Sequence, residues 1–129
     1  MRKRITGELM KKRVVIAGSR YFNDYDLFSD TVDKYLSVIR YKYEIIIMSG
    51  HCSGTDIMAE RYAYEHSYQL EVFSANWSLG KKAGPLRNKE MIDKADMAIA
   101  FFSGGRGTKS LIDFAKKKGI PLKVYSVNK

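Results

Sequence analysis

The segment DMAIAFFSGGRGTKSLIDFAKKKG, residues 96–119, decides the fold. Its first seven residues, Asp96–Phe102, form an apolar run that is too short for a helix, which predicts a buried strand. A glycine-rich turn follows, and then comes a predicted helix with lysines near its end and Gly119 as a stop signal. A buried strand followed by a glycine-rich turn and a helix is typical of βαβ units, whose strands pair in parallel.

The same alternation of strand and helix extends along the rest of the chain. Further strands are predicted at Arg13–Ser19, Glu44–Gly50, Leu70–Ala75 and 120–127, and further helices within 23–40, 53–67 and 84–95. Ser53 and Asp56 have the spacing of a capping box, and Pro85 suits the first turn of its helix. Together these elements predict an α/β fold with a doubly wound, five-stranded parallel sheet and helices on both faces.

Composition indicates one globular domain behind a basic arm. The chain has 129 residues, of which 45% are hydrophobic and 29% charged. Residues 1–13 hold six Lys or Arg and one Glu, so they supply +5 of the net charge of +9. We therefore divide the chain into an arm, residues 1–12, and a domain, residues 13–129. The arm suits either a solvated tail or a weak contact with nucleic acid or another acidic surface.

The cysteine content and the hydropathy pattern favour a cytoplasmic protein. Cys52 is the single cysteine, which excludes an internal disulfide and suits a reducing compartment. The basic arm is followed by no apolar run of the kind that signal peptides carry, and no stretch approaches the ~20 apolar residues of a membrane span. We expect no membrane partner.

Glycines, hydroxyls and arginines gather directly after the predicted strands. In doubly wound sheets, ligands bind at the carboxyl ends of the strands, where the strand order reverses. The candidate ligand-binding residues are therefore Gly18, Ser19, Arg20, Tyr21, Gly50, Ser53, Gly54, Thr55, Asp56, Trp77, Arg87, Asn88, Gly104, Gly105, Arg106, Gly107 and Thr108.

Two of these clusters, residues 53–55 and 105–108, are glycine-rich helix starts. Bare N–H groups at a helix start, supported by the helix dipole, bind anions, so both starts are predicted to cradle phosphate. Arg20, Arg87 and Arg106 would add bidentate contacts to the same group.

Other site chemistries fit the sequence less well. A P-loop and a GxGxxG fingerprint after the first strand are both missing, which argues against ordinary nucleoside-triphosphate and dinucleotide binding. His51 and Cys52 are adjacent in sequence and rarely face each other in that arrangement, which disfavours a nucleophile pair. The spacing of His and Cys matches no metal-ligand pattern, so we expect neither a metal nor a cofactor. Trp77 suits either stacking on a base or packing of its loop.

Four segments carry a family resemblance: VVIAGSRYF (14–22), SGHCSGTDIMAERYA (49–63), ANWSLGKKAGPLRNKEM (75–91) and AFFSGGRGTKSLIDFAKKKGIPL (100–122). They resemble the YspA-like branch of the SLOG superfamily, which includes the LOG phosphoribohydrolases and the DprA-type DNA-binding proteins. The resemblance implies a Rossmann-like fold and a nucleotide-derived ligand of ADP-ribose or cyclic-nucleotide type. Ser53 stands where this branch more often has an arginine.

A comparison with LOG enzymes bears on catalysis. Their signature resembles R-K-x-E-M followed by PGGxGTxxE. Residues 87–91 supply Arg87 and Glu90, and residues 103–111 supply the glycines and Thr108, but Leu111 stands where the signature has its last acid. A hydrolase that cleaves an N-glycosidic bond needs a carboxylate to stabilise positive charge on the ribose or to activate water. If the chain is an enzyme, Glu90 or Asp56 would have to supply that carboxylate.

Three functions from different classes remain open at this point. The first is binding of a nucleotide-derived, phosphate-bearing small molecule, for sensing or sequestration. The second is hydrolysis of a nucleoside phosphate, and the third is DprA-like nucleic-acid binding through the basic arm. The LOG resemblance also implies a homo-oligomer, for which Tyr62, Tyr64 and Tyr68 are expected to provide exposed aromatic surface.

Overall fold

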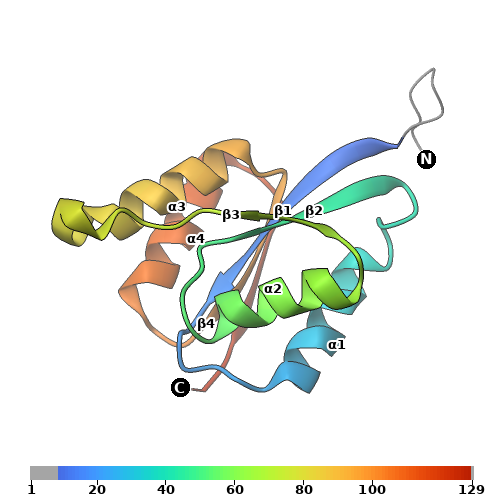
Figure 1. Cartoon of the computed structure of the whole chain (residues 1–129), viewed down its shortest axis with the longest axis horizontal. Coiled ribbons are helices and arrows are strands. Elements are labelled where there is room, and N and C mark those ends of the chain that lie inside the picture. The colour runs from blue at the N-terminus through green and yellow to red at the C-terminus, as the bar shows by residue number, and fades with distance from the viewer. Residues whose placement is uncertain (1–8, 129) are drawn as a thin grey trace.

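The computed structural model describes residues 9–128, in which five strands alternate with helices (Figure 1). In chain order the elements are β1 (Met10–Gly18), α1 (Tyr25–Leu36), β2 (Tyr43–Ser49), α2 (Thr55–Glu65), β3 (Gln69–Val72), the 3-10 helix η1 (Trp77–Lys82), α3 (Ala83–Lys94), β4 (Met97–Phe102), α4 (Arg106–Lys118) and β5 (Leu122–Ser126). None of the helices in this part of the chain is long and apolar enough to cross a membrane.

The sheet has the strand order β3-β2-β1-β4-β5, and every neighbouring pair is parallel. Helices α1 and α2 cover one face, and α3 and α4 cover the other (Figure 1). The predicted five-stranded, doubly wound parallel sheet is therefore confirmed. The chain runs outward from β1 to β3 and then returns to β4, so the strand order reverses between β1 and β4.

Alternate residues of each central strand feed two separate cores. In β1, Val14 and Ile16 pack under α1 and α2, whereas Val15 and Ala17 pack under α3 and α4. Burying a side chain of this size stabilises the fold by about 1.5–3 kcal/mol. Because both faces are covered, the central strands have the continuous apolar runs from which they were predicted.

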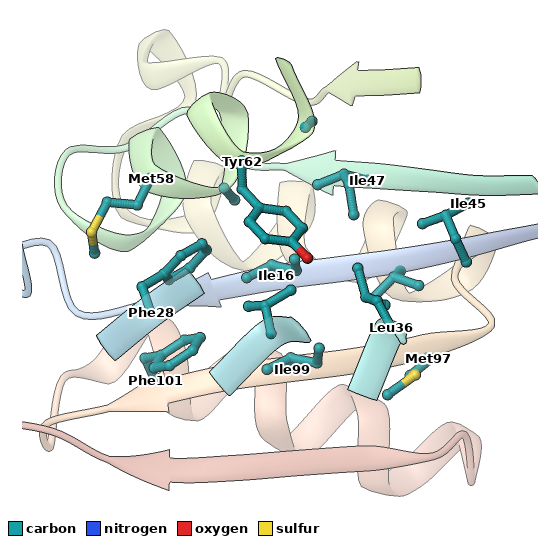
Figure 2. Close-up of a cluster of buried hydrophobic side chains, with 14 of the residues drawn as sticks. Ile16, Phe28, Leu36, Ile45, Ile47, Met58, Tyr62, Met97, Ile99 and Phe101 are labelled. Atoms are coloured by element: carbon teal, nitrogen blue, oxygen red, sulfur yellow. The ribbon is translucent and has the colours of Figure 1, made fainter. Parts of the chain in front are cut away.

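Tyr62 belongs to the core and not to the surface, which corrects the sequence prediction. Its side chain is fully buried, and Figure 2 shows the ring directed from α2 toward the sheet, near Ile16. Its hydroxyl donates a hydrogen bond to Asp33 of α1. Tyr68 is half-buried against the same cluster. Of the three tyrosines expected at the surface, Tyr64 is the exposed one.

The first strand is longer than the sequence indicated. Met10, Lys11 and Lys12 pair with Tyr43–Ile45 of β2, so β1 begins three residues before the predicted Arg13. The last residues of the predicted basic arm are thus part of the sheet, while its residues 1–8 lie outside the described part of the chain.

The start of α2 also differs from the prediction, because the expected capping box does not form. The N-cap residue is Gly54, which has a φ of 73° and offers no side-chain cap. The Ser53 hydroxyl donates instead to the carbonyl oxygen of Arg20, and Oδ2 of Asp56 accepts from the backbone N–H of Cys52. This start therefore packs against the loop after β1.

Candidate ligand-binding site

A cavity of about 370 Å³ opens at the carboxyl ends of β1 and β4, where the strand order reverses. Its size lies near the lower end of the ~300–1,000 Å³ range of ligand pockets. The predicted residues that line it are Gly18, Ser19, Arg20, Tyr21, Asp56, Trp77, Arg87, Asn88, Gly104, Gly105, Arg106, Gly107 and Thr108. Those that lie outside its lining are Gly50, Ser53, Gly54, Thr55 and Glu90.

The first turn of α4 forms one wall of the cavity. Its N-cap residue is Gly105, and no side chain among the described residues caps the helix. The N–H groups of the first turn have no partner within the helix, as at any helix start. A Cβ atom placed on Gly105 or Gly107 would meet nothing within 4 Å. The fold itself therefore does not require these two glycines, and the space above them is open.

Neighbouring contacts hold this turn in position. Gly104 has a φ of 97°, which turns the chain sharply between β4 and α4. From α3, the buried Asn88 donates from Nδ2 to the carbonyl oxygen of Gly107 over 3.0 Å. A turn and a cross-helix hydrogen bond thus hold residues 105–108, where the sequence predicts an anion site, in a fixed position.

The second glycine-rich start, at residues 53–55, has a different environment. The backbone N–H and the hydroxyl of Thr55 both donate to the carbonyl oxygen of Ser19, over 3.1 and 2.8 Å. A Cβ atom on Gly54 would lie 2.4 Å from the carbonyl carbon of Arg20, so glycine is needed there for close packing. This helix start is occupied by the loop after β1 and does not line the cavity.

Arg87 lines the cavity, but most of its donors are already used. Its guanidinium donates to the carbonyl oxygens of Gly50 and Phe73 and, through Nε, to Oδ1 of Asn88 over 2.9 Å. A second terminal nitrogen lies 3.8 Å from Sγ of Cys52. The side chain therefore joins the ends of β2 and β3 to α3, and few of its N–H groups are left for a ligand.

The mouth of the cavity is aromatic and cationic. Tyr21 and Trp77 are exposed large side chains, 67% and 59% accessible, and both line the opening. Arg20 and Arg106 are exposed beside them. Such a rim offers faces on which a planar ring can stack and charges that attract an anion.

Asp56 is a buried acid in the wall of the cavity. It is 5% exposed, and this burial raises the pKa of its carboxyl to about 6. Hydrogen bonding from Cys52 and the nearby charge of Arg87 lower the pKa, while the carboxylate of Glu60 raises it further. The carboxyl is consequently ionised at pH 7 and takes up a proton in mildly acidic solution.

Glu90, the other candidate acid, and Leu111, which stands at the position of the LOG acid, both lack a carboxylate that faces the cavity. Glu90 is exposed and lies 3.4 Å from Nζ of Lys94, outside the cavity. Leu111 is 1% exposed and forms an apolar floor together with Ala17 and Met91. The position at which LOG enzymes carry a carboxylate is therefore apolar here.

Six lining residues were not among the sequence candidates: Ala17, Cys52, Gly84, Met91, Ser103 and Leu111. Helical periodicity would have identified two of them. On α3, Gly84 lies three residues before Arg87 and Met91 lies three residues after Asn88, so each shares a helix face with a predicted site residue. Cys52 is the third residue after β2, and its position in that loop was the available signal.

A second hollow, of about 840 Å³, lies at the opposite end of the sheet. It is more open and is lined by the beginnings of β2 and β3 and by the end of α2. Ligands of doubly wound sheets bind at the carboxyl ends of the strands, so we take the smaller cavity as the candidate site. In residues 9–128, no group of three or more His, Cys, Asp or Glu side chains is arranged to hold a metal ion.

Comparison with known proteins agrees with this architecture. A family model described as the YspA, cpYpsA-related SLOG family matches residues 12–80. The chain belongs to this SLOG family. It is also 35% identical over 119 residues to the Gene 61 protein of Mycobacterium phage D29, covering 86% of this chain and 94% of the phage protein.

A solved structure supports the fold of this SLOG protein. The X-ray structure of TM1055 superposes with a TM-score of 0.63 and covers 86% of this chain and 72% of its own. The two sequences are 16% identical, so the likeness concerns the fold alone. Membership of the family suggests a nucleotide-related ligand.

Proposed function

We propose that this SLOG protein binds a nucleotide-derived small molecule that carries a phosphate group, to sense or sequester it. The observation that carries the proposal is the first turn of α4, with its uncapped N–H groups and its two glycines open to the cavity. A phosphate at a helix N-terminus is stabilised by these N–H groups and by the helix dipole. Arg20 and Arg106 at the rim supply further positive charge.

The rest of the cavity suits the remainder of a nucleotide. Tyr21 and Trp77 offer exposed aromatic faces at the mouth, on which a base can stack. The cavity of about 370 Å³ favours a ligand of mononucleotide or cyclic-nucleotide size, and an ADP-ribose-type ligand would extend past the rim.

Binding without turnover is the reading that we favour over hydrolysis. Leu111 occupies the position of the LOG acid, and an apolar side chain cannot stabilise an oxocarbenium-like transition state. The alternative, a nucleoside-phosphate hydrolase, rests on Asp56, which is the one of the two candidate acids that lines the cavity. DprA-like nucleic-acid binding relied on the basic arm, whose residues 1–8 lie outside the described part.

Titration calorimetry with the four 5′-ribonucleoside monophosphates, 3′,5′-cyclic AMP and ADP-ribose tests the proposal. We expect saturable binding of at least one of them by the whole chain, with the added compound recovered intact after prolonged incubation. Conversion of the compound to free base and ribose phosphate would favour the hydrolase instead. Heat signals absent for every compound at millimolar concentration would argue against both.

The predicted homo-oligomer remains a separate proposal, which rests on the resemblance to LOG proteins. Light scattering at micromolar concentration is its test. A particle mass of 14.8 kDa, that of one chain, would contradict self-association.

A further inference from the structure

Asp56 presents an unsatisfied acceptor to the candidate site. Its Oδ2 accepts from the backbone N–H of Cys52 over 3.1 Å, and the Cys52 thiol is a further hydrogen-bond partner of the carboxyl, but Oδ1 accepts from no nitrogen or oxygen donor in the described part. No side-chain nitrogen or oxygen atom that is fully buried in residues 9–128 lacks a partner. Oδ1 is therefore not fully buried, and the surface that the largely buried Asp56 retains is part of the cavity wall.

The carboxylate of Asp56 is unfavourable in a pocket whose ligand is only an anion. An ionised carboxylate accepts hydrogen bonds and donates none, so it repels a phosphate placed beside it. Arg87 does not cancel the effect by pairing, because its N–H groups point at the carbonyl oxygens of Gly50 and Phe73 and at Asn88. A ligand that only carries negative charge would leave this oxygen unsatisfied.

A ligand with a donor close to its phosphate resolves the conflict. The cavity then has two ends of opposite character: donors at the first turn of α4 and an acceptor at Asp56. The hydroxyls of a ribose are donors within one nucleotide's length of its phosphate, whereas a sugar without them offers Oδ1 nothing.

We infer that Oδ1 of Asp56 accepts a hydrogen bond from a ribose hydroxyl of the ligand, so that the site selects ribonucleotides over nucleotides lacking the 2′- and 3′-hydroxyls. The inference rests on the proposed function, because it concerns the ligand of the same cavity. It assigns to Asp56 a role in specificity that requires no chemistry from this residue.

The charges around the carboxyl make this selection depend on pH. Arg87 of α3, Glu60 of α2 and the thiol of Cys52 face Asp56, and Glu60 is itself held by Ser49 and His51. Protonation of the carboxyl in mildly acidic solution converts part of its acceptor capacity into a donor. The preference for hydroxyl-bearing ligands should therefore be strongest above neutral pH.

The test compares the dissociation constants of each 5′-ribonucleoside monophosphate and its 2′,3′-dideoxy counterpart with the unmodified chain at pH 7.5. A hydrogen bond to a charged group predicts that the ribonucleotide binds about 10- to 100-fold more tightly. At pH 5.0 the ratio should fall, and the titration of the phosphate cancels because both ligands carry it.

Variants separate the roles of neighbouring acids. Asp56→Asn keeps an oxygen for Cys52 but points an amide NH₂ at the cavity, so the ratio should fall several-fold. Glu60→Gln alters the next acid along the helix, outside the cavity, and should leave the ratio unchanged at pH 7.5.

The outcomes distinguish this inference from the proposed function. Equal affinity for both members of each pair in the unmodified chain would overturn the role of Asp56 while leaving phosphate binding in place. A ratio that Asp56→Asn leaves intact, in a variant with the parent's circular dichroism spectrum, would overturn it too. Binding of no nucleotide at all would remove the proposed function, and this inference with it.

Discussion

Arg87 joins three segments that are distant in sequence, through carbonyl oxygens at the ends of β2 and β3 and the amide oxygen of Asn88. The sequence suggested a phosphate clamp, but these contacts give the residue a structural task. Arg87→Ala would leave the carbonyls of Gly50 and Phe73 without their donor, and we expect unfolding free energy to fall by about 2–4 kcal/mol. Urea denaturation measures this, and Arg87→Lys should recover only part.

The matched control is Lys89→Ala, on the exposed side of the same helix, where an ion pair with Asp93 is worth less than about 1 kcal/mol. If Arg87→Ala weakened nucleotide binding while unfolding at the parent's urea midpoint, the clamp would be the better account.

Asp56 makes stability depend on pH in a direction opposite to that of most acids. Its pKa is about 6 in the folded chain against about 3.9 unfolded, so the folded state holds the proton more tightly. The unfolding free energy carries a penalty above pH 6 that disappears as the pH falls toward 4, and the gap corresponds to roughly 3 kcal/mol. Asp56→Asn should therefore be more stable than the parent at pH 8 by about 1–3 kcal/mol.

Thermal or urea unfolding of parent and variant from pH 4 to pH 8 checks this expectation. The difference between the two should shrink toward acid pH, and a constant offset across the range would show that burial does not perturb this carboxyl.

The first turn of α4 contains a glycine that lowers helix stability and leaves the surface of the candidate cavity open. Gly107 lies in the first turn, and a Cβ there would meet no atom within 4 Å. Gly107→Ala should consequently leave stability unchanged or raise it by up to about 1 kcal/mol, because alanine favours the helix. Nucleotide affinity should nevertheless fall at least tenfold, because the methyl group occupies the space above the N–H groups.

Calorimetry and urea unfolding on the same samples measure both effects. Ser110→Ala, on α4 but outside the cavity lining, serves as the control and should keep the parent's affinity. A loss of stability in Gly107→Ala with unchanged binding would show that the glycine serves the fold alone.

For the whole molecule, the sequence predicted the architecture well because its signals are local. Apolar runs marked the central strands β1, β2 and β4, and cap, proline and glycine signals marked the bounds of several helices. The 3-10 helix η1 was missed because Gly80, with a φ of 72°, interrupts it and no apolar spacing marks it. The burial of Tyr62 was missed because α2 carries aromatic residues on more than one side.

The sequence indicated where the candidate cavity lies, but not which of its groups hydrogen-bond to one another. Parallel strands bring their carboxyl ends to one edge, so the loops after β1 and β4 could be paired from sequence. Which groups remain free for a ligand depends on contacts between distant segments, such as Thr55 with Ser19 and Arg87 with Gly50. The spacing of hydrophobic residues along the sequence does not indicate hydrogen bonds between distant segments.

The reversal of strand order between β1 and β4 has a thermodynamic consequence. Residues 18–21 and 103–108 meet only after these two strands have paired, so the unfolded chain has no such cavity. Any ligand of the cavity then stabilises the native state by mass action, by about 2.7 kcal/mol at a free concentration one hundred times its Kd. For a domain of this size that raises Tm by roughly 8–10 °C. The melting temperature of the chain thus serves as a detector with which the ligand can be sought in mixtures of unknown metabolites.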